Sequence, residues 1–215
     1  MNNKGFIKFI FSVILAGFLF SCENKTVNYG LDTYYVEIVT AQNANEFLTD
    51  QGKLLVATSG NSSSSFATGD RVLLNYTLLS TTSGDNCSVR INGAAKIPLG
   101  KLTLTNDSVI RSSSKEPILL ESVWLGSHYL NMQFYLNYKS QTHKIGLLAD
   151  STRMENDTLR MYFVHDTNND PPGYPSHVYL SLDLKDVLGD PGKARPLSVQ
   201  INTDNYGDKT YGFEY

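Results

Sequence analysis

The sequence predicts an all-β protein built from two units, and three observations support this prediction. Apolar and polar residues alternate with a period of two along several segments, as half-buried antiparallel strands require. Clusters of Asn, Gly and Ser, which favour turns, separate these segments. The chain also contains 13 Tyr and 10 Phe beside one Trp, and such aromatic side chains fit pleated sheet faces. We see no heptad pattern, long helix or nucleotide-binding glycine loop in the sequence.

The first unit is predicted to contain a series of strands joined by polar turns. TSGDN at 82–86 indicates a hairpin with Gly-Asp at its tip. The serine-rich stretch at 59–65 is expected to be a polar loop, and NANEFL at 43–48 suggests a short helix. The strand-like segments are TYYVEIVT (33–40), KLLVATS (53–59), RVLLNYTLLS (71–80), SVRING (88–93) and KLTLTN (101–106).

The alternation is cleaner in the second unit. In YLNMQFYLNY (129–138) one face carries Leu130, Met132, Phe134, Leu136 and Tyr138, and VYLSLDL (178–184) alternates in the same way. Further strands are expected over 143–149, 158–164 and 197–202, which together suffice for a sandwich. LKDVLG at 184–189 suggests a helix of one or two turns. Because RSSSKEP at 111–117 breaks the strand rhythm, we divide the chain into domains over 31–112 and 113–215.

The N-terminus has the pattern of a secretory leader. Met1–Lys8 carries two cations and no acid, and a mainly apolar core of 12 residues, 9–20, follows. That core suits a signal peptide and falls short of the roughly 20 residues that a membrane-spanning helix needs. The next residues, Leu19-Phe20-Ser21-Cys22, resemble the lipobox of bacterial lipoproteins, although Phe20 is bulkier than usual.

The lipobox implies that residues 1–21 are removed and that Cys22 receives acyl chains such as palmitate. Each buried acyl CH₂ contributes about 0.8 kcal/mol, so two or more chains anchor a protein stably to a membrane. Residues 22–30 would then form a lipidated tether. An ordinary secreted protein and an uncleaved N-terminal anchor are the alternatives.

Charge and cysteine content narrow the function classes. The formal charge of −3 would become −5 when Lys4 and Lys8 leave with the leader, which does not favour binding to nucleic acid. Cys22 and Cys87 are the two cysteines, so lipidation of Cys22 leaves Cys87 as a lone thiol that we expect to fill space in the core. No motif indicates a cofactor.

Several segments together resemble one family. ESVWLGSHYLNMQFYLNYKSQTHKIGLLAD (121–150), DTLRMYFVHDTNNDPPGY (157–174) and HVYLSLDL (177–184) are similar to the carboxy-terminal half of the NigD-like lipoproteins of Bacteroidetes, and GDRVLLNYTLL (69–79) to their amino-terminal half. The resemblance implies an OB-like β-barrel followed by an immunoglobulin-like β-sandwich. It also implies a lipid-anchored envelope protein, expected at the outer membrane, with a role like bacteriocin immunity. The side of the membrane stays open, because Glu23 is the one acid directly after Cys22.

The sequence offers one weak candidate for a metal site. Asp166, Asn168 and Asp170 present oxygen atoms at alternate positions, as a calcium-binding loop does. However, Pro171 stands where the loop glycine belongs and His177 where a bidentate Glu belongs, so a polar hairpin connection is the simpler interpretation and we predict no metal.

Histidines and carboxylates show no catalytic spacing. His128, His143, His165 and His177 lie at least 12 residues apart, and we expect them at solvated strand ends. Asp183 and Glu121 lie on predicted strands without any mark that distinguishes them from surface charges. Three Asp-Ser/Thr pairs look like acceptors for O-glycosylation, at Ser108, Thr158 and Ser151, and turn chemistry before a strand is their alternative explanation.

The leading hypothesis is therefore a membrane-anchored, non-enzymatic binding protein. Its partner would be a bacteriocin, a glycan or an envelope protein, and Trp124, Tyr129 and Tyr174 could supply an aromatic binding face. For Trp124, burial in the sandwich core is the expected alternative. A hydrolase that acts on envelope or dietary polymers is the competing hypothesis, and it requires His, Asp and Glu side chains to converge in one cleft.

Overall fold

The amino-terminal part of the chain is a closed five-stranded barrel. In a computed structural model, residues 30–60, 66–81, 86–155, 158–192 and 195–215 are described, except for the side chains of 151–155. The strands follow the order β1-β2-β3-β5-β4 around the barrel, with β3 and β5 parallel and all other neighbours antiparallel. This closed five-stranded barrel agrees with the predicted OB-like fold. The strands are β1 (Tyr34–Ala41), β2 (Glu46–Thr49), β3 (Leu54–Gly60), β4 (Arg71–Thr81) and β5 (Asn86–Lys96).

The remaining strands form one eight-stranded sheet that folds over to make a sandwich. Its order is β13-β12-β10-β9-β6-β11-β8-β7. The elements are β6 (Leu99–Thr105), α1 (Asp107–Ser112), β7 (Leu119–Gly126), β8 (Tyr129–Tyr138), β9 (Lys144–Glu155), β10 (Thr158–Asp166), β11 (Tyr174–Asp183), α2 (Lys185–Leu188), β12 (Pro196–Thr203) and β13 (Gly207–Glu214).

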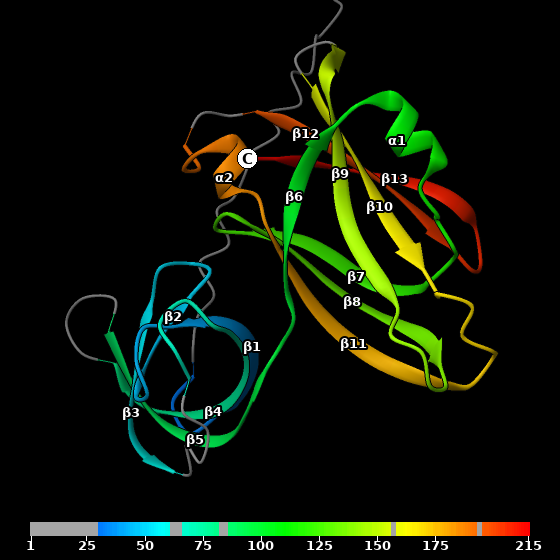
Figure 1. Cartoon of the computed structure of the whole chain (residues 1–215). Coiled ribbons are helices and arrows are strands. Elements are labelled where there is room, and N and C mark those ends of the chain that lie inside the picture. Colours follow the sequence, from blue (N-terminus) through cyan, green and yellow to red (C-terminus); the bar gives the residue numbers. More distant parts are fainter. Residues whose placement is uncertain (1–29, 61–65, 82–85, 156–157, 193–194) are drawn as a thin grey trace, which may run out of the picture.

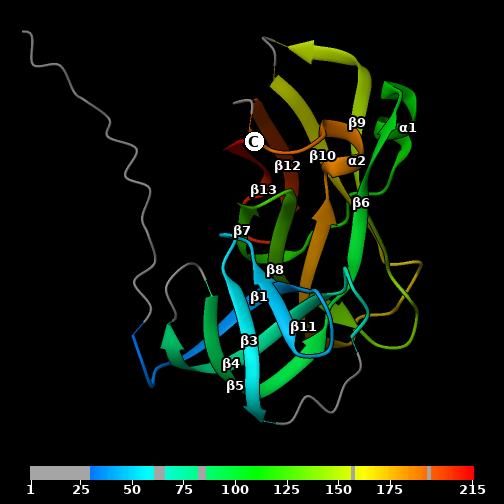
Figure 2. The same ribbon diagram turned by 90° about the vertical axis from the view of Figure 1, so that its left-hand side faces the viewer.

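Strand β6 connects the two layers of the sandwich. Its first residues, Leu99–Lys101, pair in parallel with β11, and its last residues, Leu102–Thr105, pair in parallel with β9. The sheet can therefore turn at β6, so that β7, β8 and β11 form one layer and β9, β10, β12 and β13 the other. Figure 1 shows β6 rising from the barrel into the sandwich, and Figure 2 shows the barrel below the sandwich.

Each domain has its own hydrophobic core, which follows from the alternation in its strands. Val72, Leu74, Tyr76 and Leu78 of β4 point into the barrel. Cys87 is also buried there, which confirms its predicted role as a space-filling side chain. In the sandwich, the core contains Phe163, Val199 and most of the predicted inward residues of the other layer, namely Leu130, Met132, Phe134, Leu180, Leu182 and Leu184, with Leu136 and Val178 packed against them. Tyr138, predicted on the same face of β8, is instead 42% exposed at the end of that strand.

These elements correct two sequence expectations and add one helix. The domain boundary at 112/113 is wrong, because β6 and α1 precede it and yet β6 pairs with sandwich strands. The helix expected at 43–48 is wrong, since β2 occupies Glu46–Thr49. Helix α1 was not expected, although Asn106 caps it by accepting a hydrogen bond from the Val109 N–H.

The leader, Cys22 and almost all of the tether lie outside the described residues, as do most of the loop at 59–65 and the hairpin tip at 82–85. Within the described part of the chain, no helix combines the length and apolar character that a membrane crossing demands.

Candidate functional site

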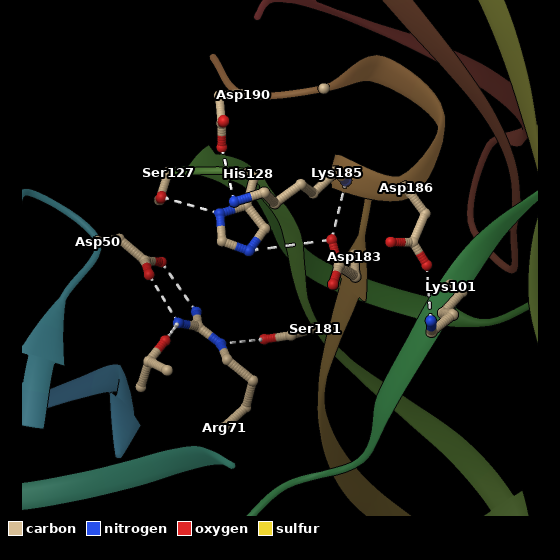
Figure 3. A network of polar contacts seen from close by, with 12 residues as sticks. Asp50, Arg71, Lys101, Ser127, His128, Ser181, Asp183, Lys185, Asp186 and Asp190 are labelled. Carbon is tan, nitrogen blue, oxygen red and sulfur yellow. Dashed lines mark hydrogen bonds and ion pairs between the residues drawn. The ribbon is translucent and has the colours of Figure 1, made fainter. Parts of the chain in front are cut away.

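A buried arginine joins the two domains. The side chain of Arg71, the first residue of β4, is fully buried and forms a bidentate ion pair with Asp50 at the β2–β3 turn, with distances of 2.7 and 2.9 Å. Its Nη1 also donates to Thr40 Oγ1 at 2.8 Å. Two further donations cross into the sandwich, from Nε to Ser181 Oγ at 3.1 Å and from Nη2 to Asn131 Oδ1 at 3.0 Å. Figure 3 shows Arg71 between Asp50 and Ser181.

These contacts use the full donor capacity of the guanidinium group. Arginine has five N–H donors, and the structure contains five donations from Arg71. The acceptors are also tied together, because Asn131 donates to Asp50 Oδ2 at 2.8 Å and Ser181 donates to Asn131 Oδ1 at 2.7 Å. The Tyr129 ring covers the guanidinium, 4.0 Å from its Cζ. We call these six residues, Thr40, Asp50, Arg71, Tyr129, Asn131 and Ser181, the junction network.

Gly126 allows the two domains to approach at this point. A Cβ atom on Gly126 would lie against the Asp50 carboxylate, 2.8 Å from its Cγ. Glycine at the end of β7 thus gives Asp50 the space to reach Arg71. The junction network fixes the barrel against the outer face of the β7–β8–β11 layer.

A groove lies beside the junction network, between the two domains. It has a volume of about 310 Å³ and is lined on the barrel side by Val36, Glu37, Ile38, Asp50, Gln51 and Leu73, and on the sandwich side by Trp124, Gln133 and Tyr179. We call it the junction groove. Trp124 is half-buried here, while its neighbours Val123 and Leu125 pack on the sandwich core. The expectation that Trp124 belongs to the core is therefore wrong, because alternation along β7 turns its side chain toward the barrel.

An aromatic row continues from the junction groove along the same sheet face. The Tyr135 ring stacks on His177 with centroids 4.5 Å apart, and His177 lies 4.7 Å from the Tyr179 ring. Glu121 Oε2 lies 3.0 Å from His177 Nε2 and accepts a hydrogen bond from Gln133. One end of this row is the junction groove, and the other end reaches a second cavity.

The second cavity has a volume of about 570 Å³. It brings together several ionisable side chains whose spacing in the sequence did not indicate a site. It is lined by Glu116, Pro117, Leu119, Tyr135, Leu136, Asn137, His143, His165, Thr167, Asp170, Pro172, Pro175 and Asp204. His143 Nδ1 lies 2.9 Å from His165 Nε2, and His143 Nε2 lies 3.4 Å from Asp170 Oδ2. His165 Nδ1 lies 3.1 Å from the Glu116 carbonyl oxygen. We call this the histidine cavity.

Two of the four histidines are thus not at solvated strand ends. His165 is 2% exposed, and the side chain of His143 is 3% exposed. Burial, followed by the proximity of His143, lowers the pKa of His165 below its ordinary value, against the opposing effect of its bond to the Glu116 carbonyl. His128 and His177 are more open, and their nearest acids are Asp183 at 3.9 Å and Glu121 at 3.0 Å.

In the weak candidate calcium loop, the carboxylates of Asp166 and Asp170 accept hydrogen bonds from the protein itself. Burial of the Asp170 carboxylate raises its pKa, but hydrogen bonds outweigh this effect and leave the pKa well below its ordinary value. The main donors are the N–H groups of Lys139, Ser140 and Gln141, and the Ser140 hydroxyl and the His143 ring add to their effect. Asp166 accepts from the Asn168 N–H, which makes a local turn. In the described ranges, no three His, Cys, Asp or Glu side chains are placed to hold a metal ion.

The other predicted site residues are scattered. Tyr129 is buried against Arg71, and Tyr174 is 85% exposed and does not line the junction groove. Ser108 is exposed on α1 and Thr158 is half-buried at the start of β10, while the side chain of Ser151 lies outside the described residues. Of the three predicted binding aromatics, Trp124 alone lines the groove.

Comparisons with known proteins place the chain in a family. The model of the NigD-like C-terminal β-sandwich domain matches residues 98–215, more than half of the chain. None of the curated proteins matches the chain.

Solved structures share the fold. A protein of unknown function from Bacteroides vulgatus is 20% identical, with a TM-score of 0.74 over 85% of this chain and 91% of its own. A NigD-like immunity protein from Bacteroides caccae is 22% identical, with a TM-score of 0.59 over 87% and 98%. A protein described as a candidate lipoprotein from Bacteroides fragilis is 10% identical, with a TM-score of 0.58 over 85% and 96%. By the family match over its sandwich, this chain belongs to the NigD-like family.

Proposed function

We propose that this protein is a lipid-anchored, non-enzymatic binding protein of the bacterial cell envelope, in which the junction groove holds a cationic polypeptide segment. The single observation that carries the proposal is the junction network. A groove between two domains can be a stable binding surface when the domains do not move, and here a fully satisfied buried arginine fixes them.

The lining of the junction groove favours a polypeptide with positive charge. Trp124 and Tyr179 offer large, rigid apolar surface, which is typical of the energetically dominant positions in interfaces. The charged side chains that line the groove are the carboxylates of Glu37 and Asp50, and the guanidinium of Arg71 is buried behind them. Glu37 is half-buried and accepts a hydrogen bond from the Tyr76 hydroxyl at 3.2 Å, and a lysine or arginine on the partner would complement its charge.

Immunity to a bacteriocin is the role that fits this description. It draws on the likeness to the NigD-like immunity protein of Bacteroides caccae and on the lipobox at Cys22. Anchoring by lipid at the outer membrane would keep the groove where an incoming toxic peptide arrives. A glycan bound to the same aromatic row is the alternative ligand.

The histidine cavity gives little support to a hydrolase. His165 has both ring nitrogens engaged, and three backbone N–H groups occupy the oxygens of Asp170. A general base needs a free lone pair within reach of its substrate. Nε2 of His143 would have to serve, yet it faces Asp170 at 3.4 Å.

The experiment is a capture from producer-strain envelopes with the Cys22-anchored protein as bait. Trp124→Ala/Tyr179→Ala should lose at least about 90% of a bound peptide, because the loss of two anchors of more than about 1 kcal/mol each reduces affinity more than tenfold. Tyr174→Ala, which removes an exposed aromatic that does not line the groove, is the matched control and should retain the peptide. Equal capture of the peptide by the unmodified protein and by both variants would refute binding in the junction groove. Capture of a glycan instead of a peptide would identify the alternative ligand.

A further inference from the structure

A β-bulge at Glu121 shapes the outer face of the β7–β8–β11 layer. The register between β7 and β8 shifts between Leu120 and Ser122, which leaves Glu121 as an extra residue on β7. Regular alternation would place two residues five positions apart on opposite faces of a strand. Because of the bulge, Leu119 and Trp124 both face outward, where the first lines the histidine cavity and the second lines the junction groove.

The bulge also presents a carboxylate oxygen between the two cavities. Glu121 Oε2 accepts a hydrogen bond from Gln133 Nε2 at 2.7 Å and lies 3.0 Å from His177 Nε2. Glu121 Oε1 accepts no hydrogen bond from the described part of the chain, and the side chain is 38% exposed. Gln133 thus orients the carboxylate while one oxygen stays open to a partner. Guanidinium and ammonium groups form the strongest hydrogen bonds to such an oxygen.

The rings of the aromatic row cover one another. His177 stacks on Tyr135 with an interplanar angle of 13° and centroids 4.5 Å apart, and the Tyr179 ring lies 4.7 Å from the same imidazole. A sugar would need an open ring face, whereas the edges of stacked rings carry partial positive charge that attracts carbonyl oxygens. The row therefore suits the backbone of a polypeptide better than a sugar ring.

The outer face forms one continuous path from the junction groove to the histidine cavity. On β8, Gln133 lines the groove, and Tyr135 and Asn137 line the cavity. Asn131 of the junction network lies on the same side of the strand, because the side chains of every second residue share a face. At about 3.4 Å per residue, the path from Asn131 to Asn137 extends over about 20 Å. An extended polypeptide has the same rise, so about seven residues span it.

From this geometry we infer that the junction groove, the aromatic row and the histidine cavity together bind one extended polypeptide segment of about seven residues, with an arginine or lysine opposite Glu121 Oε1. The inference rests on the proposed function, because it begins from the segment in the junction groove, and it adds a length, a conformation and a second charge contact. Glu121 has the same sign as Glu37 and Asp50 in the groove, and the described lining residues of the groove and the cavity include no lysine or arginine.

The test uses blocked synthetic peptides as probes. They are an octapeptide and a tetrapeptide of alternating arginine and alanine, and an octapeptide of alternating glutamate and alanine. Trp124 is the one tryptophan of the chain, so its fluorescence reports binding in the groove, while the imidazole NMR signals of His177 report binding on the row. The arginine octapeptide should bind the full mature chain at least about tenfold more tightly than the tetrapeptide, and it should shift the His177 signals. The glutamate octapeptide should not bind.

Variants separate this path from general attraction of cations to an acidic protein. Glu121→Gln keeps the shape of the side chain and should weaken the arginine octapeptide about fivefold. Glu214→Gln, at an exposed position on β13 that lines neither cavity, is the matched control and should change nothing. Tyr135→Ala should weaken the octapeptide about tenfold and leave the tetrapeptide unaffected.

The outcomes also separate this inference from the proposed function. Equal affinities of the two arginine peptides, lost in Trp124→Ala/Tyr179→Ala but unchanged in Glu121→Gln and Tyr135→Ala, would overturn the inference and leave binding in the groove intact. Failure of both arginine peptides to bind would refute the groove as a site for a cationic polypeptide, and the inference with it. Maltohexaose that shifts the His177 signals where the octapeptide does not would assign the path to a glycan instead.

Discussion

The junction network and the histidine cavity are both buried polar clusters, but they differ in completeness. Around Arg71, five donors meet acceptors from two domains, and the acceptors are bonded to one another. Around His143, the Nε2 atom lies 3.4 Å from an Asp170 oxygen and forms no hydrogen bond of good geometry with the described residues. The first cluster is therefore fully hydrogen-bonded, whereas the second contains one long contact between His143 and Asp170.

This difference affects how much each cluster rigidifies the protein. Buried polar groups that are all satisfied rigidify a protein, while an unsatisfied group costs free energy until something pairs with it. The junction network therefore holds the domains, and the histidine cluster contributes less to rigidity than its burial suggests.

Loss of the Arg71 charge should have the largest effect. Arg71→Met leaves the Asp50 carboxylate buried without its partner, and Asn131 and Ser181 lose a donor. Removing one member of a buried ion pair costs about 3–5 kcal/mol of unfolding free energy. Urea denaturation of the mature protein measures this loss.

Two further variants serve as controls for Arg71→Met. Lys101→Met removes a lysine from the exposed pair with Asp186 and should leave stability unchanged. Arg71→Met combined with Asp50→Asn should cost less than the sum of the single changes, since the uncompensated charge disappears. Strict additivity would contradict the coupling that we assign to the pair.

A smaller loss of unfolding free energy is expected when an added methyl group crowds the contact between the two domains. Gly126→Ala places a methyl group against Asp50, and overpacking of this kind costs about 1–3 kcal/mol. Gly212→Ala on β13 is the matched control, because its Cβ would meet open space. If thermal unfolding showed the same Tm for both variants, Gly126 would not be needed at the junction.

Asp170 should contribute stability that acid removes. Asp170→Asn keeps one oxygen, but its amide group faces the Lys139 N–H as a second donor, so one hydrogen bond is lost. The lowered pKa means that the carboxylate stabilises the fold above its ordinary value of 3.8 and loses this effect as the pH falls further. The deficit of the variant should be constant above about pH 5 and shrink below pH 3.8. A deficit independent of pH would argue against a charge effect.

The smallest predicted effect concerns His165. Because its folded-state pKa lies below 6.5, the folded protein is most stable with this ring neutral, and stability falls as the pH decreases below 6.5. His165→Gln should remove part of that decrease, which chemical denaturation between pH 7.5 and 5 can measure. An unchanged pH profile in the variant would show that His165 does not titrate as described.

The sequence predicted those parts of the molecule that depend on local pattern. Alternation in 129–138 correctly placed Leu130, Met132 and Phe134 in the core, because neighbours along one strand determine its faces. The domain boundary failed because β6 pairs with β9 and β11, which lie far along the chain and are parallel to it. Such long-range pairing has no local signature.

The site residues were harder to predict for the same reason. Arg71 meets Asn131 and Ser181 across 60 and 110 positions, and the sequence shows only a cation at the start of an apolar strand. His143 and His165 could have been paired, since a hairpin of 143–149 with 158–164 brings their strands together. Burial of both rings, however, depends on Glu116 and on the β10–β11 loop.

The most direct test of the account is whether the barrel and the sandwich move as one body. Residual dipolar couplings of the mature protein should fit a single alignment tensor for both domains, and in Arg71→Met they should require two. Separate tensors in the unmodified protein would contradict a fixed junction and, with it, a preformed binding groove.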